Sequence, residues 1–273
     1  MNVNLQLSGV FSNLHSLRNL NKEMGLSFTG IIPARYESTR FPGKPLALID
    51  GVPMVVRVWE RAKKALNNVY IATDHQDIYE VATKAGAEVI LTSSMHETGT
   101  ERIAEAAYKI FENKDSSNQV IINIQGDEPM ITKDAILDLC DVFEDIEVKI
   151  ATLFHEFKNI DDLNNPNRPK VTIDNSGNAI SFSRTPMPNR SINYQHIGVY
   201  AYKLEALYEI NKLHPTPMER TERLEQIRWL NNGYSIRCVK NEYQGIGVDS
   251  PEDLEALSKL LQKIRINQKK KNQ

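Results

Sequence analysis

Three cations follow one another in the stretch GIIPARYESTRFPGKPL (30–46), which begins with an apolar run that predicts a buried strand. Arg35, Arg40 and Lys44 come after that strand, in a loop that also contains prolines and Gly43. In parallel α/β sheets, ligands bind beyond the carboxyl ends of the strands, and cations on a stiff loop suit the phosphates of a triphosphate. The loop matches neither the G-x-x-x-x-G-K-[ST] phosphate loop nor the G-x-G-x-x-G dinucleotide turn. A solvated surface loop stays open as the alternative.

A second strand end carries carboxylates. The run NIQGDEPMI (123–131) predicts a strand that leads into a turn with Gln125, Asp127 and Glu128. Because Mg²⁺ prefers one or two carboxylates together with phosphate oxygens and water, Asp127 is a candidate metal ligand. Asp249, in GIGVDSPEDLE, is the second candidate. Each has a structural alternative: Asp127 as an ordinary turn residue and Asp249 as part of a helix cap.

The histidine, cysteine and helical glutamate side chains indicate fewer kinds of site. None of the six histidines has the spacing of a helical zinc site, and His196, which opens an apolar strand, is the one best placed to face a ligand. The sequence contains no G-x-S-x-G elbow, and Cys140 and Cys238 lack the features of activated nucleophiles. Glu222 and Gln226 lie four residues apart on an expected helix, so they share either a sugar-binding face or a solvated one.

Short apolar runs that alternate with helical patterns would position these groups. Buried strands are predicted at 28–33, 68–73, 87–92, 118–124 and 148–154, and helices near 53–66, 76–85, 98–112 and 132–145. This order indicates right-handed βαβ units and a mostly parallel sheet that is covered on both faces.

The pattern changes after about residue 157. A polar loop leads into two strands within 170–183 that are joined by a turn, and an apolar strand is predicted at 196–202. A helix is predicted at 218–231 and a last one at 251–264, where Ser250 and Pro251 give a good start signal. We expect residues 265–273 to form a frayed tail.

The composition is that of an ordinary globular protein, with 41% hydrophobic and 25% charged residues in 273. A net charge of −2 gives no global field for nucleic acid, and no apolar run is long enough for a membrane span. Residues 1–26 lack the compact apolar run of a signal peptide, so we expect an extension outside the fold and a cytoplasmic protein with reduced thiols.

Several motifs together resemble those of the 3-deoxy-manno-octulosonate (Kdo) cytidylyltransferase family. They are IIPARYESTRFPGKPL, ATDHQDI, ETGTERIAEAA, INIQGDEPMI, FSR, HIGVYAY, LEQIRWL and GVDSPEDLE, which occur in this order from about residue 28 to 257. The first and fourth are highly specific in combination. The resemblance covers essentially all of the chain except its two ends.

The resemblance implies a Rossmann-like α/β nucleotidyltransferase fold in a single domain, 27–264, with a smaller inserted β-rich region, 158–217, for sugar binding and dimerisation. It implies transfer of CMP from CTP to Kdo, with release of pyrophosphate, as a step of lipopolysaccharide synthesis. It also implies a Mg²⁺ requirement and a homodimer. The anomeric hydroxyl of Kdo would attack the α-phosphate in line, without a protein nucleophile.

The resemblance also assigns residues to roles. Arg35, Lys44 and Asp127 would be catalytic, and Asp127 and Asp249 would bind the metal. The nucleotide would be held by Pro33, Ala34, Arg35, Arg40, Lys44, Thr73, Asp74 and Arg102. The sugar would be held by Gln125, Arg184, His196, Glu222, Glu225 and Gln226, with Arg184 or Arg102 as the cation for its carboxylate.

Three other functions stay open at this point. A cytidylyltransferase for another substrate, such as sialic acid or methylerythritol phosphate, is the nearest. A glycosyltransferase that uses a nucleotide sugar would need an Asp-x-Asp motif, which is missing at the fourth strand. A non-catalytic nucleotide-sugar sensor is the third, and the presence of Arg35, Lys44, Asp127 and Asp249 together argues against it.

Overall fold

The computed structural model describes residues 25–38, 40–187, 192–245 and 247–271, so most of the predicted extension 1–26 lies outside it. The chain forms two compact units. Unit 1 includes Asp115–Ile121 and Leu137–Asn241, and unit 2 includes Thr29–Lys114, Ile122–Ile136 and the residues from Glu242 onward. Unit 1 is thus larger than the inserted region 158–217 expected from the sequence.

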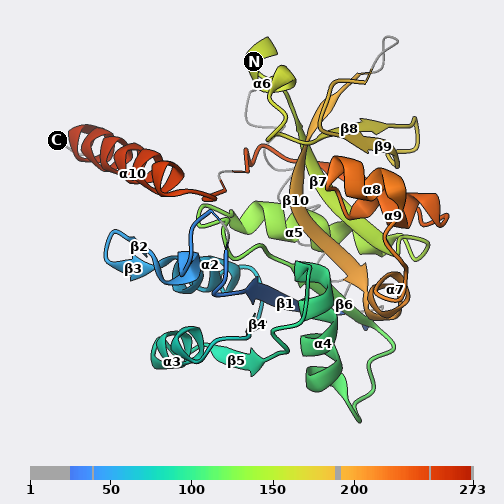
Figure 1. The fold of residues 1–273 in the computed structure, drawn as a ribbon, viewed down its shortest axis with the longest axis horizontal. Helices are drawn as coiled ribbons and strands as arrows, with labels where there is room; N and C mark the ends of the chain where they lie inside the picture. Colours follow the sequence, from blue (N-terminus) through green and yellow to red (C-terminus); the bar gives the residue numbers. More distant parts are fainter. Residues whose placement is uncertain (1–24, 39, 188–191, 246, 272–273) are drawn as a thin grey trace, which may run out of the picture. The chain divides into compact units, whose positions relative to one another are not determined.

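Unit 2 is built on parallel strands. β1 (Ser27–Ala34) pairs in parallel with β4 (Asn68–Thr73), and β4 pairs in parallel with β5 (Glu88–Leu91) (Figure 1). Just after β6 (Gln119–Asn123), the backbone N–H of Ile124 donates to the carbonyl of Ile31 at 3.2 Å. The ends of β1 and β6 therefore lie side by side, as the predicted strand order requires.

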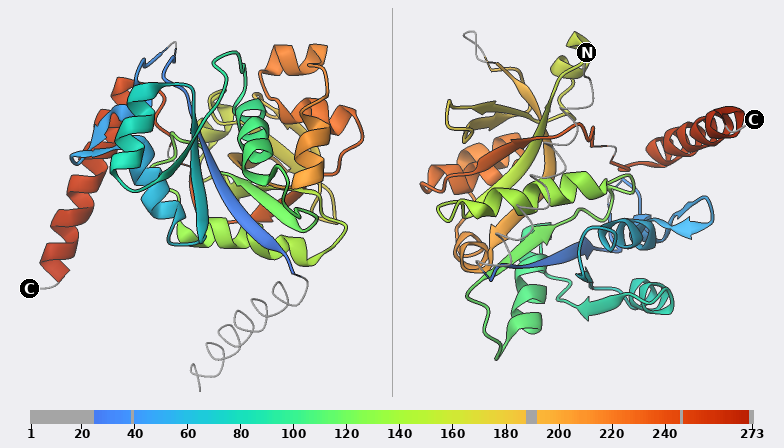
Figure 2. Two further views of the ribbon diagram at one scale, coloured as in Figure 1. Left: turned by 90° about the horizontal axis from the view of Figure 1, so that it is seen from below. Right: turned by 180° about the vertical axis from the view of Figure 1, so that it is seen from behind.

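Helices cover both faces of these strands. Figure 2 shows α2 (Met54–Ala62) and α3 (Gln76–Lys84) on one face and α4 (Gly99–Phe111) on the other. The apolar spacing that predicts α2 corresponds to its buried face, where Met54, Val58 and Ala62 have no exposed area. The prediction of parallel strands covered by helices is confirmed for this unit.

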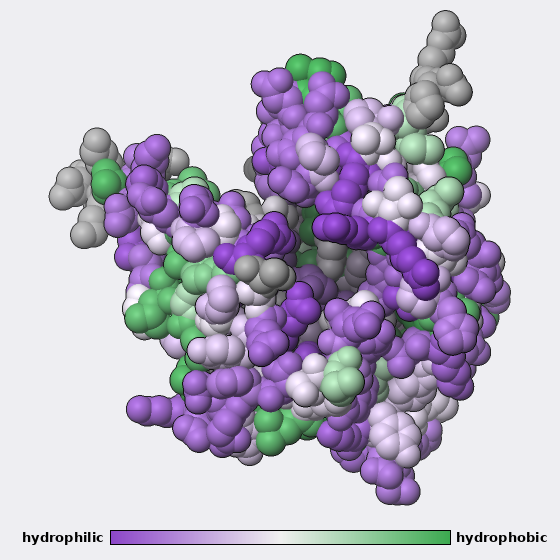
Figure 3. All heavy atoms as spheres, in the orientation of Figure 1, coloured by the Kyte–Doolittle hydropathy of each residue, from purple (hydrophilic) through white to green (hydrophobic). Residues whose placement is uncertain are grey.

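A short 3₁₀ helix, η1 (Lys44–Leu46), and a hairpin of β2 (Leu48–Ile49) and β3 (Val52–Pro53) precede α2. Figure 3 shows hydrophobic residues on the surface over α2 and this hairpin, where Leu48 is 60% exposed. Beneath that surface, one apolar cluster joins the hairpin, α2 and α10 (Pro251–Lys271); its buried members are Ile49, Met54, Val248, Leu257 and Leu261.

The same cluster anchors the segments that carry the candidate site residues. Phe41 comes from the basic loop, Met130 from the turn after β6, and Leu254 from the first turn of α10, and all three pack against it. Full burial of an apolar side chain contributes roughly 1.5–3 kcal/mol, and these partly buried side chains contribute a fraction of that each. Three segments that are remote in sequence therefore converge at one end of the sheet of unit 2.

The last helix is longer than predicted. α10 continues to Lys271, where a frayed tail was expected from residue 265. No glycine or proline interrupts residues 252–271, so nothing in the sequence ends the helix at residue 264. No helix within the described ranges has the length and apolar character needed to cross a membrane.

Unit 1 contains the antiparallel part of the sheet. β10 (Tyr194–Lys203) pairs antiparallel with β7 (Ile150–Glu156), and β11 (Arg237–Lys240) pairs in parallel with β7. β8 (Lys170–Ile173) and β9 (Ala179–Ser183) form the predicted pair of strands. The remaining helices are α5 (Lys133–Asp141), η2 (Val142–Glu144), α6 (Ile160–Asn164), α7 (Leu204–Ile210), α8 (Pro217–Glu222) and α9 (Gln226–Asn231).

The predicted single helix 218–231 is wrong, because the chain breaks it into α8 and α9. Arg223 adopts the left-handed conformation, with φ 53° and ψ 46°, and ends α8. Glu222 and Gln226 consequently lie on different helices, and the argument that they share one helix face does not hold.

Candidate nucleotide and metal site

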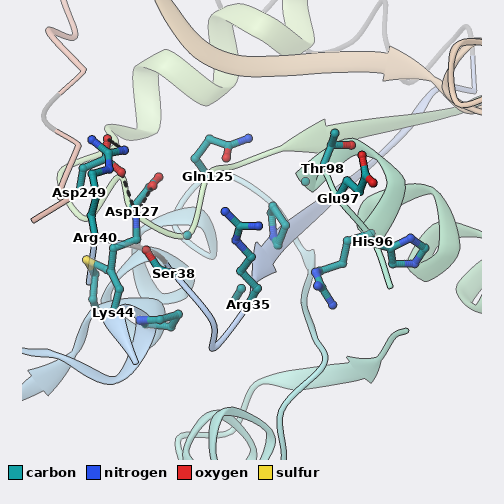
Figure 4. A pocket seen from close by; sticks show the side chains of 17 residues that line it. Arg35, Ser38, Arg40, Lys44, His96, Glu97, Thr98, Gln125, Asp127 and Asp249 are labelled. Atoms are coloured by element: carbon teal, nitrogen blue, oxygen red, sulfur yellow. Dashed lines mark hydrogen bonds and ion pairs between the residues drawn. The ribbon is translucent and has the colours of Figure 1, made fainter. Parts of the chain in front are cut away.

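A pocket of unit 2 gathers the chemistry-bearing side chains at the carboxyl ends of β1 and β6 (Figure 4). Its lining comes from the loop after β1, the turn after β6, the start of α4 and the segment before α10. The lining residues are Pro33, Ala34, Arg35, Ser38, Arg40, Lys44, Pro45, Met54, His96, Glu97, Thr98, Gly99, Arg102, Gln125, Gly126, Asp127 and Asp249. Among the described residues, this pocket thus contains most of the predicted nucleotide-binding set.

The basic loop is folded by local contacts. Gly43 has φ 69°, a left-handed conformation that favours glycine, and its N–H donates to the carbonyl of Tyr36 at 3.0 Å. The ring of Tyr36 stacks on that of His75, with the centroids 3.9 Å apart. This closed turn directs Lys44 and Arg40 toward the carboxylates, and Figure 4 shows Arg35 between these residues and the start of α4.

The turn after β6 approaches the loop so closely that it requires glycine. A Cβ atom at Gly126 would lie 2.7 Å from the carbonyl oxygen of Pro33, a distance at which the backbone would have to move. The glycine of QGDEP therefore allows Asp127 to lie next to the loop that carries Lys44.

Lys44 joins the two predicted metal ligands. Its Nζ lies 2.7 Å from Oδ2 of Asp127 and 3.0 Å from Oδ1 of Asp249, while Arg40 contacts Oδ2 of Asp249 at 3.0 Å. Burial by itself would lower the pKa of Lys44, but the two carboxylates raise it above its usual value. Burial likewise opposes ionisation of Asp249, yet Lys44 and Arg40 hold its pKa below the usual range. Both carboxylates thus converge on a single cation.

Glu128, the next residue of the turn, points into the interior rather than into the pocket. It is only 9% exposed, and its carboxylate accepts a hydrogen bond from the hydroxyl of Tyr243. Burial raises the pKa of Glu128 to about 8, and the nearby charges of Asp127 and Asp249 act in the same direction. Glu128 is therefore a structural partner of the site and does not line it.

The opposite end of the pocket comes from the N-terminus of α4. Thr98 caps this helix and forms a capping box with Glu101, and His96 and Glu97 lie just before it. A helix N-terminus favours negative groups, so the edge suits an anionic ligand in addition to the cations of the loop. Sequence reasoning missed His96, Glu97, Thr98 and Ser38 as lining residues. The T-x-x-E box in TGTE is the signal from which this helix start can be recognised.

Of three further predicted nucleotide-binding residues, Arg102 lines the pocket and the other two do not. Arg102 is 2% exposed, and its guanidinium donates to Asp74 at 2.7 Å and to the hydroxyl of Thr92 at 2.6 Å. Thr73 is fully buried, and neither it nor Asp74 lines the pocket. Because Arg102 is neutralised by Asp74, its remaining pocket surface has little net positive charge.

Besides Arg102, Gln125 is the predicted sugar-binding residue that lines this pocket, and its amide donates to Asn123 at 2.7 Å. The other predicted sugar residues belong to unit 1. There His196 is buried between the rings of Phe182 and Tyr200, and its Nε2 lies 2.9 Å from the hydroxyl of Thr152. Burial lowers the pKa of His196 to about 3, so this imidazole is neutral at pH 7.

Arg184 and Glu222 are already engaged within unit 1. The guanidinium of Arg184 donates to the carbonyls of Glu222 at 2.6 Å and of Pro166 at 3.0 Å, and the carboxylate of Glu222 accepts the backbone N–H of Arg184 at 2.8 Å. Gln226 differs, because its amide nitrogen is buried and has no hydrogen-bond partner in the described part of the chain. An orphaned donor of this kind is costly unless a ligand or water completes it.

Comparisons with known proteins agree with these features. The cytidylyltransferase family model matches residues 29–237. The chain is 44% identical to a 3-deoxy-manno-octulosonate cytidylyltransferase of Parabacteroides distasonis, over 84% of this chain and 96% of that protein. It is also 44% identical to one of Fusobacterium nucleatum, over 84% of this chain and 95% of that protein.

A solved structure of CMP:2-keto-3-deoxy-manno-octonic acid synthetase complexed with CTP is similar in fold. It matches with a TM-score of 0.80 and 34% identity, over 87% of this chain and 99% of that chain. The predicted Rossmann-like nucleotidyltransferase fold is thereby confirmed. With the family model and the relatives in agreement over most of its length, the chain belongs to the 3-deoxy-manno-octulosonate cytidylyltransferase family.

Proposed function

We propose that this protein transfers CMP from CTP to Kdo and releases pyrophosphate, as a step toward lipopolysaccharide. The observation that carries the proposal is the convergence of Arg40, Lys44, Asp127 and Asp249 at the strand ends of unit 2, in a pocket that also contains Arg35. The similarity to cytidylyltransferases over most of the chain supports the identity of both substrates.

The donor set suits a divalent cation. Asp127 and Asp249 both lie within 3.0 Å of one Lys44 nitrogen, so their oxygens already converge on a point of positive charge. The described residues contain no group of three or more potential protein ligands, which fits Mg²⁺ because this ion usually keeps several waters and takes phosphate oxygens. We infer that Asp127 and Asp249 hold Mg²⁺. When bound, Mg²⁺ acts as a Lewis acid that favours loss of the proton from the sugar hydroxyl.

The reaction needs positioning and charge stabilisation more than covalent chemistry. The anomeric oxygen of Kdo forms a bond to the α-phosphorus of CTP, its proton passes to solvent, and the bond from that phosphorus to the β-phosphate oxygen breaks. Negative charge then grows on the departing pyrophosphate. Arg35, Arg40 and Lys44 are the cations that would neutralise it, and the N-terminus of α4 adds its dipole.

The sugar-binding role of the unit 1 residues is part of this proposal. The amide nitrogen of Gln226 has no hydrogen-bond partner among the described residues, so it can donate to a hydroxyl of a polyhydroxylated ligand. The imidazole of His196 is neutral, and its charge does not change near pH 7, so it can be a second hydrogen-bonding partner for the ligand. The engaged guanidinium of Arg184 argues that this residue orders the α8–α9 segment. Within unit 2, considered by itself, Gln125 lines the pocket, and we propose that it binds the sugar.

We also propose a homodimer and a cytoplasmic location. Both proposals rest on the family resemblance. The cytoplasmic location also rests on the need for CTP as a substrate. Light scattering coupled to size exclusion would show a species of twice 31.1 kDa if the dimer exists.

A pyrophosphate-release assay tests the function directly. The purified protein is mixed with CTP and Mg²⁺ and, in parallel, with Kdo, sialic acid or methylerythritol phosphate, or with no acceptor. Release with Kdo alone is the expected result. Preference for another acceptor would replace the substrate assignment, and CTP binding without release in any arm would favour a sensor. Comparable rates with UTP or ATP in place of CTP would contradict the choice of base.

A further inference from the structure

The segment that ends at Asp249 is fastened to the turn that carries Asp127. The backbone N–H of Val248 donates to the carbonyl of Asp127 at 2.9 Å. A Cβ atom at Gly247 would lie 3.7 Å from Oε1 of Glu128, so the segment packs directly on the turn. The hydroxyl of Tyr243 forms the third contact, a hydrogen bond to the buried carboxyl group of Glu128. Backbone and side-chain contacts therefore bind the two pieces of chain together.

The Tyr243–Glu128 contact is the only one of these three that a side-chain substitution removes cleanly. The two residues are 115 positions apart in sequence and are 6% and 9% exposed. A hydrogen bond between two buried groups is costly to lose, because no water replaces the missing partner. Its loss leaves a buried carboxyl group underpartnered next to the peptide that carries Asp127.

A second anchor holds the other side of Asp249. The carboxylate of Asp253 accepts the backbone N–H groups of Asp249 at 3.0 Å and of Ser250 at 2.9 Å, so the start of α10 is capped. With its backbone held by α10 on one side and by the turn on the other, Asp249 has only its side-chain rotamer left to adjust.

We propose that Tyr243 is a positioning residue for the metal site: its hydrogen bond to Glu128 keeps Asp249 close enough to Asp127 for both carboxylates to bind one divalent cation. The proposal rests on the proposed function, in which these two residues hold Mg²⁺. Tyr243 does not line the pocket. It affects the reaction only by fixing the position of Asp249.

The test measures metal binding in place of turnover. Mn²⁺ alone is titrated into the full chain without nucleotide, and its binding is followed by water-proton relaxation. We expect Tyr243→Phe, which removes one oxygen atom, to weaken Mn²⁺ binding about tenfold, the lower end of what partners beyond the ligands contribute. The matched control is Tyr234→Phe, because the hydroxyl of Tyr234 also donates to a glutamate, Glu209, at 3.1 Å but lies in unit 1. The control should bind Mn²⁺ as the parent does.

Further variants make every outcome decisive. If Tyr243→Phe does not fold, as judged by circular dichroism, Glu128→Met removes the acceptor oxygens from the other side of the same contact with a side chain of similar length. Metal affinity within twofold of the parent in a folded variant overturns the proposal, even if its melting temperature falls, because a merely structural role predicts that pattern. Asp127→Asn is measured alongside. If it also leaves Mn²⁺ binding unchanged, the metal site itself is refuted; if it alone weakens binding, only the role of Tyr243 is refuted.

Discussion

At the scale of single residues, the two contacts proposed for Lys44, with the carboxylates and with phosphate, compete. In the structure its ammonium lies between Asp127 and Asp249, the position from which a divalent cation would contact both carboxylates. When phosphates bind, a lysine on this loop is equally placed to contact them. A metal that binds to the two carboxylates must first displace the ammonium, which is then free for the nucleotide.

We therefore expect Lys44→Met to separate binding from catalysis. Without nucleotide, Mn²⁺ should bind at least about threefold more tightly than to the parent, because a nearby positive charge has been removed. Turnover should nevertheless fall about a hundredfold or more, since one preorganised charge-stabilising group is lost. Relaxation titration and the pyrophosphate assay give the two values.

Lys109→Met is a suitable control, because Lys109 pairs with Glu105 at 2.7 Å and does not line the pocket. It should leave the affinity for Mn²⁺ unchanged. Weaker Mn²⁺ binding in Lys44→Met than in the parent would mean that Lys44 helps to organise the carboxylates.

The buried His196 gives the free energy of unfolding a pH dependence. Burial lowers its pKa to about 3, whereas the unfolded chain takes up the proton near pH 6.5. Below about pH 6.5 the unfolded state binds a proton that the folded state does not. The stability contribution is thus complete above that pH and is lost progressively as the pH falls toward 3.

From pH 7 to pH 5 this loss should amount to about 2 kcal/mol. Urea unfolding at the two pH values measures it, and in His196→Gln the difference between them should shrink by about that amount. An unchanged pH dependence in the variant would show that His196 titrates alike in both states.

At the scale of elements, the break between α8 and α9 decides how the unit 1 residues are presented. Arg223 takes a left-handed conformation at which a side chain costs roughly 1 kcal/mol, and its carbonyl accepts from Arg184 at 3.3 Å. The chain turns at this point, so Glu222 ends one helix and Gln226 begins the next.

Arg223→Gly should raise the free energy of unfolding by about 1 kcal/mol, because glycine adopts this conformation without strain. Arg220→Gly, inside α8 and also exposed, is the matched variant and should lower it by about 1 kcal/mol. Urea denaturation distinguishes the two. If both changes lowered the free energy of unfolding, the Arg223 side chain would stabilise the fold by more than its left-handed backbone conformation costs.

At the scale of the whole molecule, the cytidylyltransferase match begins at residue 29, close to the start of β1. The residues of the pocket all come from positions 33–127 and from Asp249. None of the described contacts of the pocket needs residues before β1.

We accordingly expect a chain that begins at Met24 to retain the parent's kcat/KM for CTP and its melting temperature within about 2 °C, a shift below that of a typical 1 kcal/mol change. The pyrophosphate assay and thermal unfolding check this. A clear drop in either quantity would assign a role to the extension.

The sequence by itself determined which residues were candidates for the site. Strand-end position and residue type made Arg35, Lys44 and Asp127 candidates, because parallel strands bring their carboxyl ends to one edge wherever the sheet forms. Asp249 was a candidate through its residue type and its place before the last helix. Periodicity likewise located α2 and the β8–β9 pair, and a capping signal located the start of α10, since these signals depend on neighbours a few residues away.

Only the tertiary structure decided which of these groups touch. That Lys44 bridges both carboxylates, that Glu128 turns inward to Tyr243, and that Arg102 is neutralised by Asp74 are contacts between residues 28 to 205 positions apart. The break at Arg223 was equally hidden, because the sequence has neither glycine nor proline there and the left-handed conformation is held by its surroundings. The local sequence pattern specifies each helix and strand, whereas the contacts between distant residues depend on which helices and strands pack together.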